Sequence, residues 1–385
     1  MDGPLRRVCG AALIMGAAAC GYPPLPEIIR DGPDGRSLDD APPVDAVPDA
    51  PDVPVCFSTA PFALCVARTP PPLFAPSDAV MLDTTSSPMC ADLMSGGDLC
   101  VIAATAIDVR GSLQAVGARP LVLFAVDSIT VSGAIDVGSH QGMPERIGAG
   151  ADPHDCVAGT SPTSLAGGGG GSFMGVGGNG GISGADGSVG GVAGAATTTI
   201  SAIRGGCPGR DGNGFTPGLG GHGGHGGGAV LLIAGQSIVL GASARINASG
   251  EGGGGGMASS LGSGGGGGGT GGMIAFDAPT VMAASTSVLV ANGGGGGEGS
   301  IRMVSGRAGG DPDQPSAAPG GAGGGTGGNG GNGSAGAAAG PGSSGQRAGA
   351  TLDFGGGGGG GGGAGLVAAR VTADLGPMVS PAVTH

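Results

Sequence analysis

Large aromatic side chains are scarce in this chain. Its 385 residues include no tryptophan, one tyrosine and eight phenylalanines, against 96 glycines. So few large side chains bury little apolar area, which argues against one large conventional core. Glycine also disfavours helices, by about 1 kcal/mol per residue relative to alanine. Because glycine loses the most backbone entropy on folding, order here requires dense backbone hydrogen bonding or covalent cross-links.

Lysine is absent, and the 15 basic residues, all arginine, face 28 acidic ones. The resulting net charge of −13 argues against nucleic acid as a partner. Without lysine the chain contains no P-loop for nucleotide phosphates. Matches to G-x-G-x-x-G carry no information against such a glycine background, and no strand, turn and helix pattern follows them. We therefore expect no cofactor.

The amino terminus has the features of an export signal. Arg6 and Arg7 precede a short apolar stretch over residues 8–18, which is too short to span a bilayer as a stable helix. The sequence Ala-Ala-Ala-Cys-Gly that ends at Gly21 resembles the lipobox of bacterial lipoproteins, although alanine stands where leucine is usual. We predict a signal peptide over residues 1–19 and lipidation of Cys20, with plain secretion after an Ala-x-Ala site as the alternative.

Residues 20–55 are rich in proline and aspartate. Like charges repel one another and proline favours an extended chain, so we predict a disordered tether that would hold the following domain off a membrane surface.

Of the eight cysteines, Cys9 lies in the predicted signal peptide and Cys20 at its end, which leaves six. An even number in an exported chain indicates three disulfides, although six cysteines allow 15 pairings. None has the C-x-x-C spacing of a zinc or redox site. Residues 56–99 are predicted to form a cysteine-containing cap. We favour pairing of nearest neighbours, which joins Cys56 with Cys65, Cys90 with Cys100, and Cys156 with Cys207.

An alternating apolar and polar pattern recurs at a fixed spacing. Residues 106–115 match residues 128–137 at an offset of 22, the difference between Ile129 and Ile107. Alternation is the period of a β-strand, and the offset is about one coil of a parallel β-helix. Similar strand patterns return at three later places, residues 229–248, 273–292 and 366–371.

These patterns predict an all-β fold over residues 100–385, a parallel β-helix or solenoid of about five coils. Glycine-rich insertions at 140–227, 251–271 and 294–364 would leave from the same corner of successive coils. Strands around Ile107, Ile129, Ile238 and Val288 would then stack in parallel. The alternative is a β-sandwich, in which the same strands form antiparallel hairpins.

Glycine falls on every third position from Gly175 to Gly190 and from Gly321 to Gly336. Three residues per turn is the period of polyproline II, and bare faces of such segments would pack through backbone hydrogen bonds. Ordered polyproline II and disorder both remain open for these insertions. The Gly-Gly-Ala and Gly-Gly-Asn runs of residues 320–333 resemble PGRS-type proteins. The layout also resembles uncharacterised surface lipoproteins of myxobacteria, which implies a surface location more than a mechanism.

Sites for chemistry are few. His222 and His225 are weak candidates for copper, nickel or zinc ligands, because no third ligand is evident nearby. A β-helix enzyme that acts on polysaccharides needs carboxylates stacked on successive coils. The 22-residue offset instead sets Asp108 against Thr130 and Asp136 against Gln114. No histidine follows a G-x-S-x-G elbow.

We therefore expect an exported cell-surface structural or adhesive protein without catalytic activity, which displays glycine-rich surfaces on a β scaffold. It would be a bacterial outer-membrane or cell-surface lipoprotein, or else secreted, and would meet a membrane only through an amino-terminal lipid anchor. The expected partners are extracellular polysaccharide or other cell-surface components. The alternative is a β-helix protein that binds or degrades polysaccharide.

Overall fold

The computed structural model describes residues 55–57, 64–66, 70–90, 93–95, 98–184, 187–197, 199–323, 327–335, 341–349, 354–370, 375–376 and 378–384. The predicted signal peptide, the lipidation candidate Cys20 and the tether up to residue 54 lie outside these residues. The described residues form strands and no helices, so the all-β prediction is confirmed. Accordingly, they include no helix long and apolar enough to cross a membrane.

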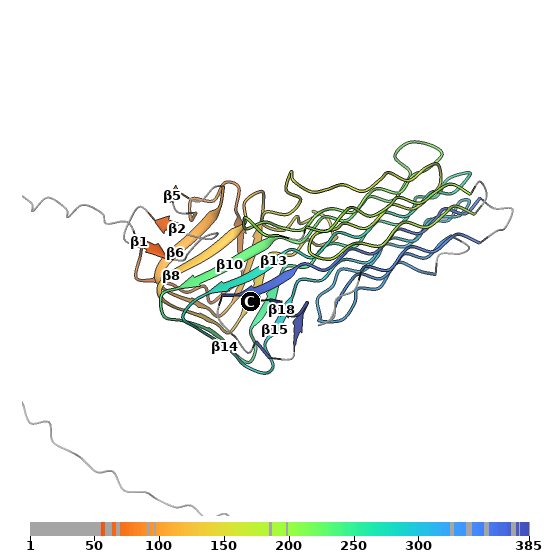
Figure 1. The fold of residues 1–385 in the computed structure, drawn as a ribbon. Coiled ribbons are helices and arrows are strands. Elements are labelled where there is room, and N and C mark those ends of the chain that lie inside the picture. Colours follow the sequence, from red (N-terminus) through yellow and green to blue (C-terminus); the bar gives the residue numbers. More distant parts are fainter. Residues whose placement is uncertain are drawn as a thin grey trace, which may run out of the picture. The chain divides into compact units, whose positions relative to one another are not determined.

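Most strands belong to two parallel sheets (Figure 1). A nine-stranded sheet contains β3 (Leu73–Phe74), β6 (Cys100–Val109), β8 (Leu121–Val131), β10 (Ala229–Ala234), β11 (Ser237–Leu240), β13 (Met273–Asp277), β14 (Thr280–Ala283), β16 (Leu366–Ala369) and β18 (Val383–Thr384). A six-stranded sheet contains β4 (Val80–Asp83), β7 (Ser112–Val116), β9 (Ala134–Asp136), β12 (Arg245–Asn247), β15 (Val288–Val290) and β17 (Val379–Ser380). A small antiparallel sheet contains β1 (Val55–Phe57), β2 (Leu64–Val66) and β5 (Leu93–Ser95).

The strand register follows the repeat seen in the sequence. Ile107 of β6 pairs with Ile129 of β8, at the expected offset of 22 residues, and Ile129 in turn pairs with Ile238 of β11. The next residue in this row is Val281 of β14, whereas Val288 lies in the six-stranded sheet, which corrects the expectation that Val288 stacks on Ile238. Every pair described in the two large sheets is parallel, so they lack the antiparallel hairpins that the β-sandwich alternative requires.

The parallel pairing also extends toward the amino terminus. β3 and β4 lie within the segment predicted as a cap, yet β3 pairs with β6 and β4 pairs with β7.

Aliphatic side chains from the two large sheets form one buried core. The six-stranded sheet contributes a row in which Leu113, Ile135, Ile246 and Leu289 pair strand to strand. All four side chains are fully buried. Because each strand adds one residue to the row, the core grows along the stack mainly through aliphatic residues, with Phe276 as an aromatic member.

The wholly apolar strands are buried on both faces. In β10, Val230 and Leu232 point into the main core, while Leu231 and Ile233 belong to a second cluster. Residues from outside the parallel sheets complete the second cluster, namely Leu64, Val66, Phe173 and Ile203. In β11 the burial alternates instead, since one of its faces is less covered. A strand is therefore wholly apolar where its outer face is covered, and it alternates apolar and polar residues where that face is less covered. This explains why the two kinds of strand follow one another in each repeat.

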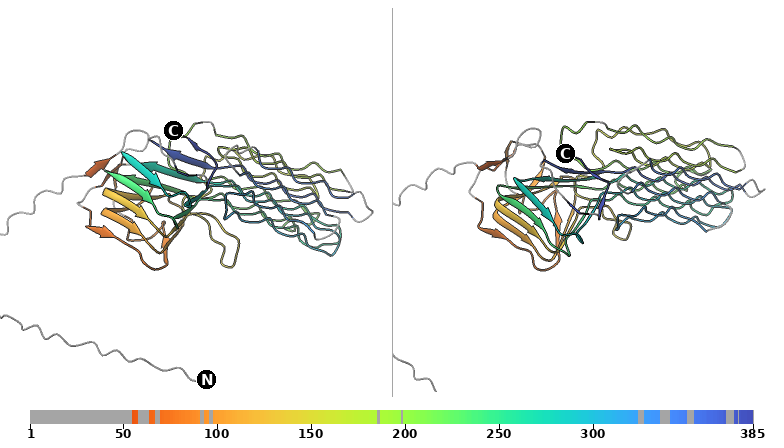
Figure 2. Two further views of the ribbon diagram at one scale, coloured as in Figure 1. Left: turned by 90° about the horizontal axis from the view of Figure 1, so that it is seen from below. Right: turned by 60° about the horizontal axis from the view of Figure 1, so that its bottom comes forward.

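Three glycine-rich segments connect the two sheets. They leave after the neighbouring strands β9, β12 and β15 of the six-stranded sheet. They return at the neighbouring strands β10, β13 and β16 of the nine-stranded sheet. In all views these segments run side by side away from the sheets (Figures 1 and 2). We call them together the glycine bundle.

Backbone hydrogen bonds hold the bundle together. The amide of Gly168 donates to Gly265 O, that of Gly265 donates to Gly357 O, and that of Gly360 donates back to Gly168 O, each at 2.9 Å. The same three bonds repeat three residues further along each segment. Three residues is the polyproline II period, and here the backbone groups bond between segments instead of to water. The described parts of these segments are therefore ordered.

Glycine is required in the bundle because neighbouring segments approach one another too closely to leave room for a Cβ atom. A Cβ atom on Gly359 would lie 1.9 Å from Gly266 O, and one on Gly330 would lie 1.8 Å from Gly296 O. Real Cβ atoms essentially never come within 3.0 Å of another atom in this way. Few described glycines have a positive φ, so most are not needed for unusual backbone angles.

Three disulfides join Cys56 to Cys65, Cys90 to Cys100, and Cys156 to Cys207, which are the pairs expected from the sequence. They indicate an oxidising, extracytoplasmic compartment. Beside the third disulfide, the Arg204 guanidinium lies 3.1 Å from the Cys207 sulfur and 5.0 Å from the centre of the Phe173 ring.

We expect Gly359→Ala to lower the free energy of unfolding by about 3 kcal/mol, because the added methyl group would overlap Gly266 O. Gly241→Ala is the matched control, since a Cβ there would find its nearest neighbour, Val131 O, at an ordinary 3.4 Å. Urea unfolding of the two variants measures the difference. Equal stabilities would contradict the close-approach explanation.

The Cys156–Cys207 disulfide spans 51 residues, and the Cys56–Cys65 disulfide spans 9. Longer loops lose more unfolded-state entropy when closed, so replacing the first pair by serine should destabilise by about 4 kcal/mol and the second pair by about 2.5 kcal/mol. Denaturant unfolding of the two double variants tests this order, and a larger loss for the short loop would overturn it.

Candidate functional site

The structure separates the two histidines that the sequence suggested as metal ligands. The His222 side chain is 76% exposed, and its Nδ1 atom lies 4.0 Å from a carboxylate oxygen of Asp211. His225 is more buried and contacts different residues. Within the described residues, the group of side chains close enough to share a metal ion consists of Glu145, His225 and Glu251, without His222.

The ring of His225 is held between carboxylates. Its Nδ1 atom pairs with Oδ2 of Asp152, whose Oδ1 accepts a hydrogen bond from the Gly226 amide at 2.8 Å. Its Nε2 atom lies 3.6 Å from Oε1 of Glu145. Asp152 thus orients the ring so that Nε2 is directed at Glu145.

Glu251 approaches the same histidine from another segment. Its side chain is buried, and Oε2 accepts a hydrogen bond from the His225 amide at 3.1 Å. Burial raises the pKa of Glu251 to about 7, although His225 acts in the opposite direction. The hydrogen bond to Asp152, helped by the charges of Asp152, Glu251 and Glu145, raises the pKa of His225 to about 9 against the effect of burial. At neutral pH a protonated His225 therefore compensates the surrounding carboxylates.

This cluster, which we call the His225 cluster (Glu145, Asp152, His225 and Glu251), lies where the glycine bundle meets the sheets. Glu145 and Asp152 follow β9, His225 precedes β10, and Glu251 follows β12. Sequence reasoning missed both glutamates because they are far from His225 along the chain. One available signal was the isolated acidic residue Glu251 at the start of a glycine run.

A second polar group lies beside it, around Asp136 of β9. The Asp136 carboxylate contacts Nε2 of His140 at 2.9 Å and accepts a hydrogen bond from Asn247 of β12 at 3.0 Å. Asp136 also pairs in register with Gln114 of β7. The hydrogen bond to Asp136 raises the pKa of His140, with a further contribution from the charge of Asp311 and against the effects of burial and Arg146.

Carboxylates do not stack along the strands that the structure describes. Asp108 pairs with Thr130, and Asp136 pairs with Gln114, as the sequence offset predicted. A cleft beside the Cys156–Cys207 disulfide has a volume of about 80 Å³, which is small beside the roughly 300 Å³ of ordinary ligand pockets.

The turns at the end of the bundle away from the sheets carry exposed apolar side chains. Both ends of the segment between β12 and β13 start at the sheets, so its middle turn, residues 257–263, lies at the far end. Neighbouring turns contact it through backbone bonds from Met257 to Leu219 O and from Met303 to Ser259 O, both 2.9 Å. We call residues 213–219, 257–263, 300–305 and 354–356 the distal turn surface. Its exposed apolar side chains are Phe215, Met257, Met303, Val304 and Phe354.

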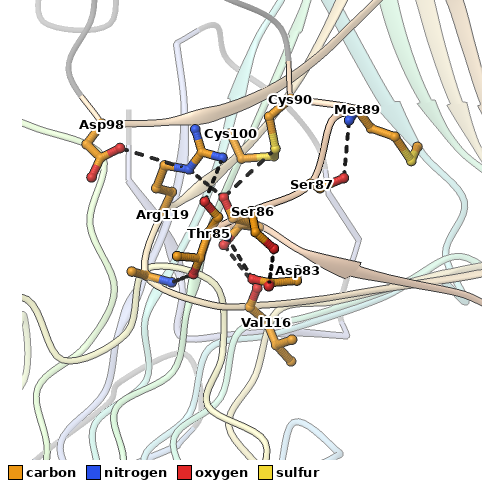
Figure 3. The surroundings of a disulfide bond; sticks show 12 residues. Asp83, Thr85, Ser86, Ser87, Met89, Cys90, Asp98, Cys100, Val116 and Arg119 are labelled. Atoms are coloured by element: carbon orange, nitrogen blue, oxygen red, sulfur yellow. Dashed lines mark hydrogen bonds and ion pairs between the residues drawn. A yellow bond between two sulfur atoms is a disulfide. The ribbon is translucent and has the colours of Figure 1, made fainter.

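Hydrogen bonds around the Cys90–Cys100 disulfide hold the neighbouring loops in place (Figure 3). Arg119 donates to the carbonyl oxygens of Thr84 and Thr85. The Asp83 carboxylate accepts from the Thr85 amide and from the Ser86 hydroxyl. These bonds fix the turn after β4 against the loop after β7.

No protein-family model, no curated protein and no solved structure matches this chain.

His140 should make stability depend on pH. Because its pKa in the folded state lies above 6.5, its contribution is fully present below pH 6.5 and is lost as the pH rises through the raised value. We therefore expect His140→Gln to be destabilising at low pH and closer to neutral at high pH. Asp136→Asn should give the same trend.

Urea unfolding over a pH series measures this effect as the difference between wild type and each variant. Taking the difference removes the titration of His225, which is common to all three proteins. A difference that stays constant above pH 6.5 would contradict the role of His140.

Proposed function

We propose that this protein is an exported, non-enzymatic structural or adhesive protein of the bacterial cell surface. In this proposal a parallel β-solenoid carries the glycine bundle, and the bundle presents the distal turn surface to a partner. The observation that carries the proposal is the cluster of exposed apolar side chains on turns held together by backbone hydrogen bonds.

The solenoid assignment is supported by the stacking of strands. The main-core rows continue in register from β7 through β9 and β12 to β15, and glycine segments leave after three successive strands of this sheet. Repeated units that each contact their neighbours are the defining feature of solenoid proteins.

The adhesive role is supported by how the apolar side chains are displayed. Phe215 is 70% exposed and Met303 is 74% exposed, on two turns that each contact the middle turn, residues 257–263. Grouped exposed apolar residues typically mark interaction sites, because leaving them in water is unfavourable. The flat face of a phenylalanine ring also suits the apolar face of a sugar ring, so extracellular polysaccharide is the partner we favour over other cell-surface components.

Export is supported by the three disulfides together with the amino-terminal sequence pattern. A lipid anchor at Cys20 would place the protein on a bacterial membrane, with residues 20–55 as a tether. Secretion without an anchor is the alternative.

The competing function, degradation of polysaccharide, requires a pair of carboxylates that face a substrate groove. The strand register supplies no such pair, and Glu251 is buried against the His225 amide. These observations favour binding over catalysis.

The test measures binding of the full chain to extracellular polysaccharide from the producing bacterium. We expect Phe215→Ser combined with Met303→Ser to weaken binding about tenfold, or about 1.4 kcal/mol, as hot-spot residues do. The matched control is Met81→Ser, since Met81 is 65% exposed on β4 and away from the turns.

Equal binding by the double variant and the control would overturn the role of the distal turn surface. Release of new reducing ends during incubation would support the enzyme instead.

A further inference from the structure

We propose that Glu145, His225 and Glu251 form a binding site for a divalent transition-metal ion, with zinc as the representative ion. The site would be structural and would fasten the loop after β9 to two hairpins of the glycine bundle. This proposal concerns the junction of bundle and sheets, so it does not depend on the adhesive role of the distal turns.

The three side chains offer a suitable ligand set. The ligand atoms of Glu145, His225 and Glu251 all lie within 4.8 Å of one another. One imidazole nitrogen and two carboxylate oxygens, completed by a water molecule as the fourth ligand, suit zinc and similar ions, which prefer mixed nitrogen and oxygen ligands. Calcium would bind less well, since it takes six or more oxygen ligands.

One of the ligand pairs already lies near the separation expected of a bound state. Bonds of about 2 Å in a tetrahedral site put ligand atoms about 3.3 Å apart. Nε2 of His225 is 3.6 Å from Oε1 of Glu145, so this pair needs little movement. The Glu145 side chain is 54% exposed and is free to adjust, whereas Glu251 is buried and lies within 4.8 Å of the other two ligands.

The histidine is oriented as a metal ligand requires. Asp152 pairs with Nδ1 of the ring, and a carboxylate on that nitrogen typically fixes the tautomer in which Nε2 binds the metal. The Gly226 amide holds Asp152 in turn. On binding, the metal ion would replace the proton on Nε2, which would leave to solvent.

A metal ion here would add a cross-link between three parts of the chain that hydrogen bonds already connect, such as those of Asp152 with His225 and of the His225 amide with Glu251. Glu145 belongs to the loop after β9, His225 to the hairpin before β10, and Glu251 to the hairpin after β12. Because the glycine segments offer few side chains near their ends, a metal ion would strengthen the links at the base of the bundle.

Calorimetric titration of the chelator-treated full chain with zinc tests the proposal. We expect one zinc ion per chain, loss of binding in Glu145→Gln and Glu251→Gln, and affinity about tenfold lower in Asp152→Asn. His222→Gln is the matched control, because that exposed histidine lies outside the group, and it should bind zinc as the wild type does. Zinc should also raise the thermal midpoint of the wild type and leave that of Glu145→Gln unchanged.

Three results would overturn the proposal. These are no heat of binding in the wild type, a loss in His222→Gln as large as that in Glu145→Gln, or calcium binding as tight as zinc binding. If Glu251→Gln fails to fold, Glu145→Gln still tests the site, because the Glu145 side chain is 54% exposed and its replacement should leave the fold intact.

Discussion

The glycine bundle depends on contacts that only a residue without a Cβ atom permits. Carbonyl oxygens of one segment approach the Cα atoms of the next so closely that an added Cβ at Gly359 would lie 1.9 Å from oxygen. This closeness lets the amides of three segments bond to one another in a repeating pattern. Hydrogen bonds between backbones thus do the work that side chains do in an ordinary core, and they offset the large entropy loss of ordering glycine.

The sheets determine where the glycine segments begin, and so which residues can meet. The amides of Ala248, Gly250 and Gly253 each donate a hydrogen bond to the carbonyl oxygen of the residue 42 positions later in the chain. This constant spacing continues the parallel register of β12 with β15 directly into the bundle. A change in strand register would therefore shift every later bond between these segments. The aliphatic core and the bundle are two parts of one stack.

Short-range features of this fold were predictable from the sequence, and long-range ones were less so. The 22-residue offset predicted the pairing of Ile107 with Ile129 because the two strands are joined by a short connection of regular length. Glycine at every third position predicted the three-residue period of the bundle. It did not predict that the segments are ordered, because their order depends on hydrogen bonds to neighbouring segments that lie in register. Val288 was placed in the wrong row because the short strand β14 around Val281 was not recognised. The His225 cluster was missed because its members come together only when the two sheets have stacked.

The same close packing limits where function can reside. A position whose Cβ would overlap a neighbouring backbone accepts no side chain, so most positions inside the bundle are closed to functional groups, with buried polar residues such as Glu298 as exceptions. The side chains that we propose to bind ligands lie on the turns and at the junction with the sheets. Phe215 and Met303 lie on the turns, and the His225 cluster lies at the junction with the sheets. Under these proposals, sequence variation at the two ends would change what the protein binds while the glycine pattern between them stays fixed.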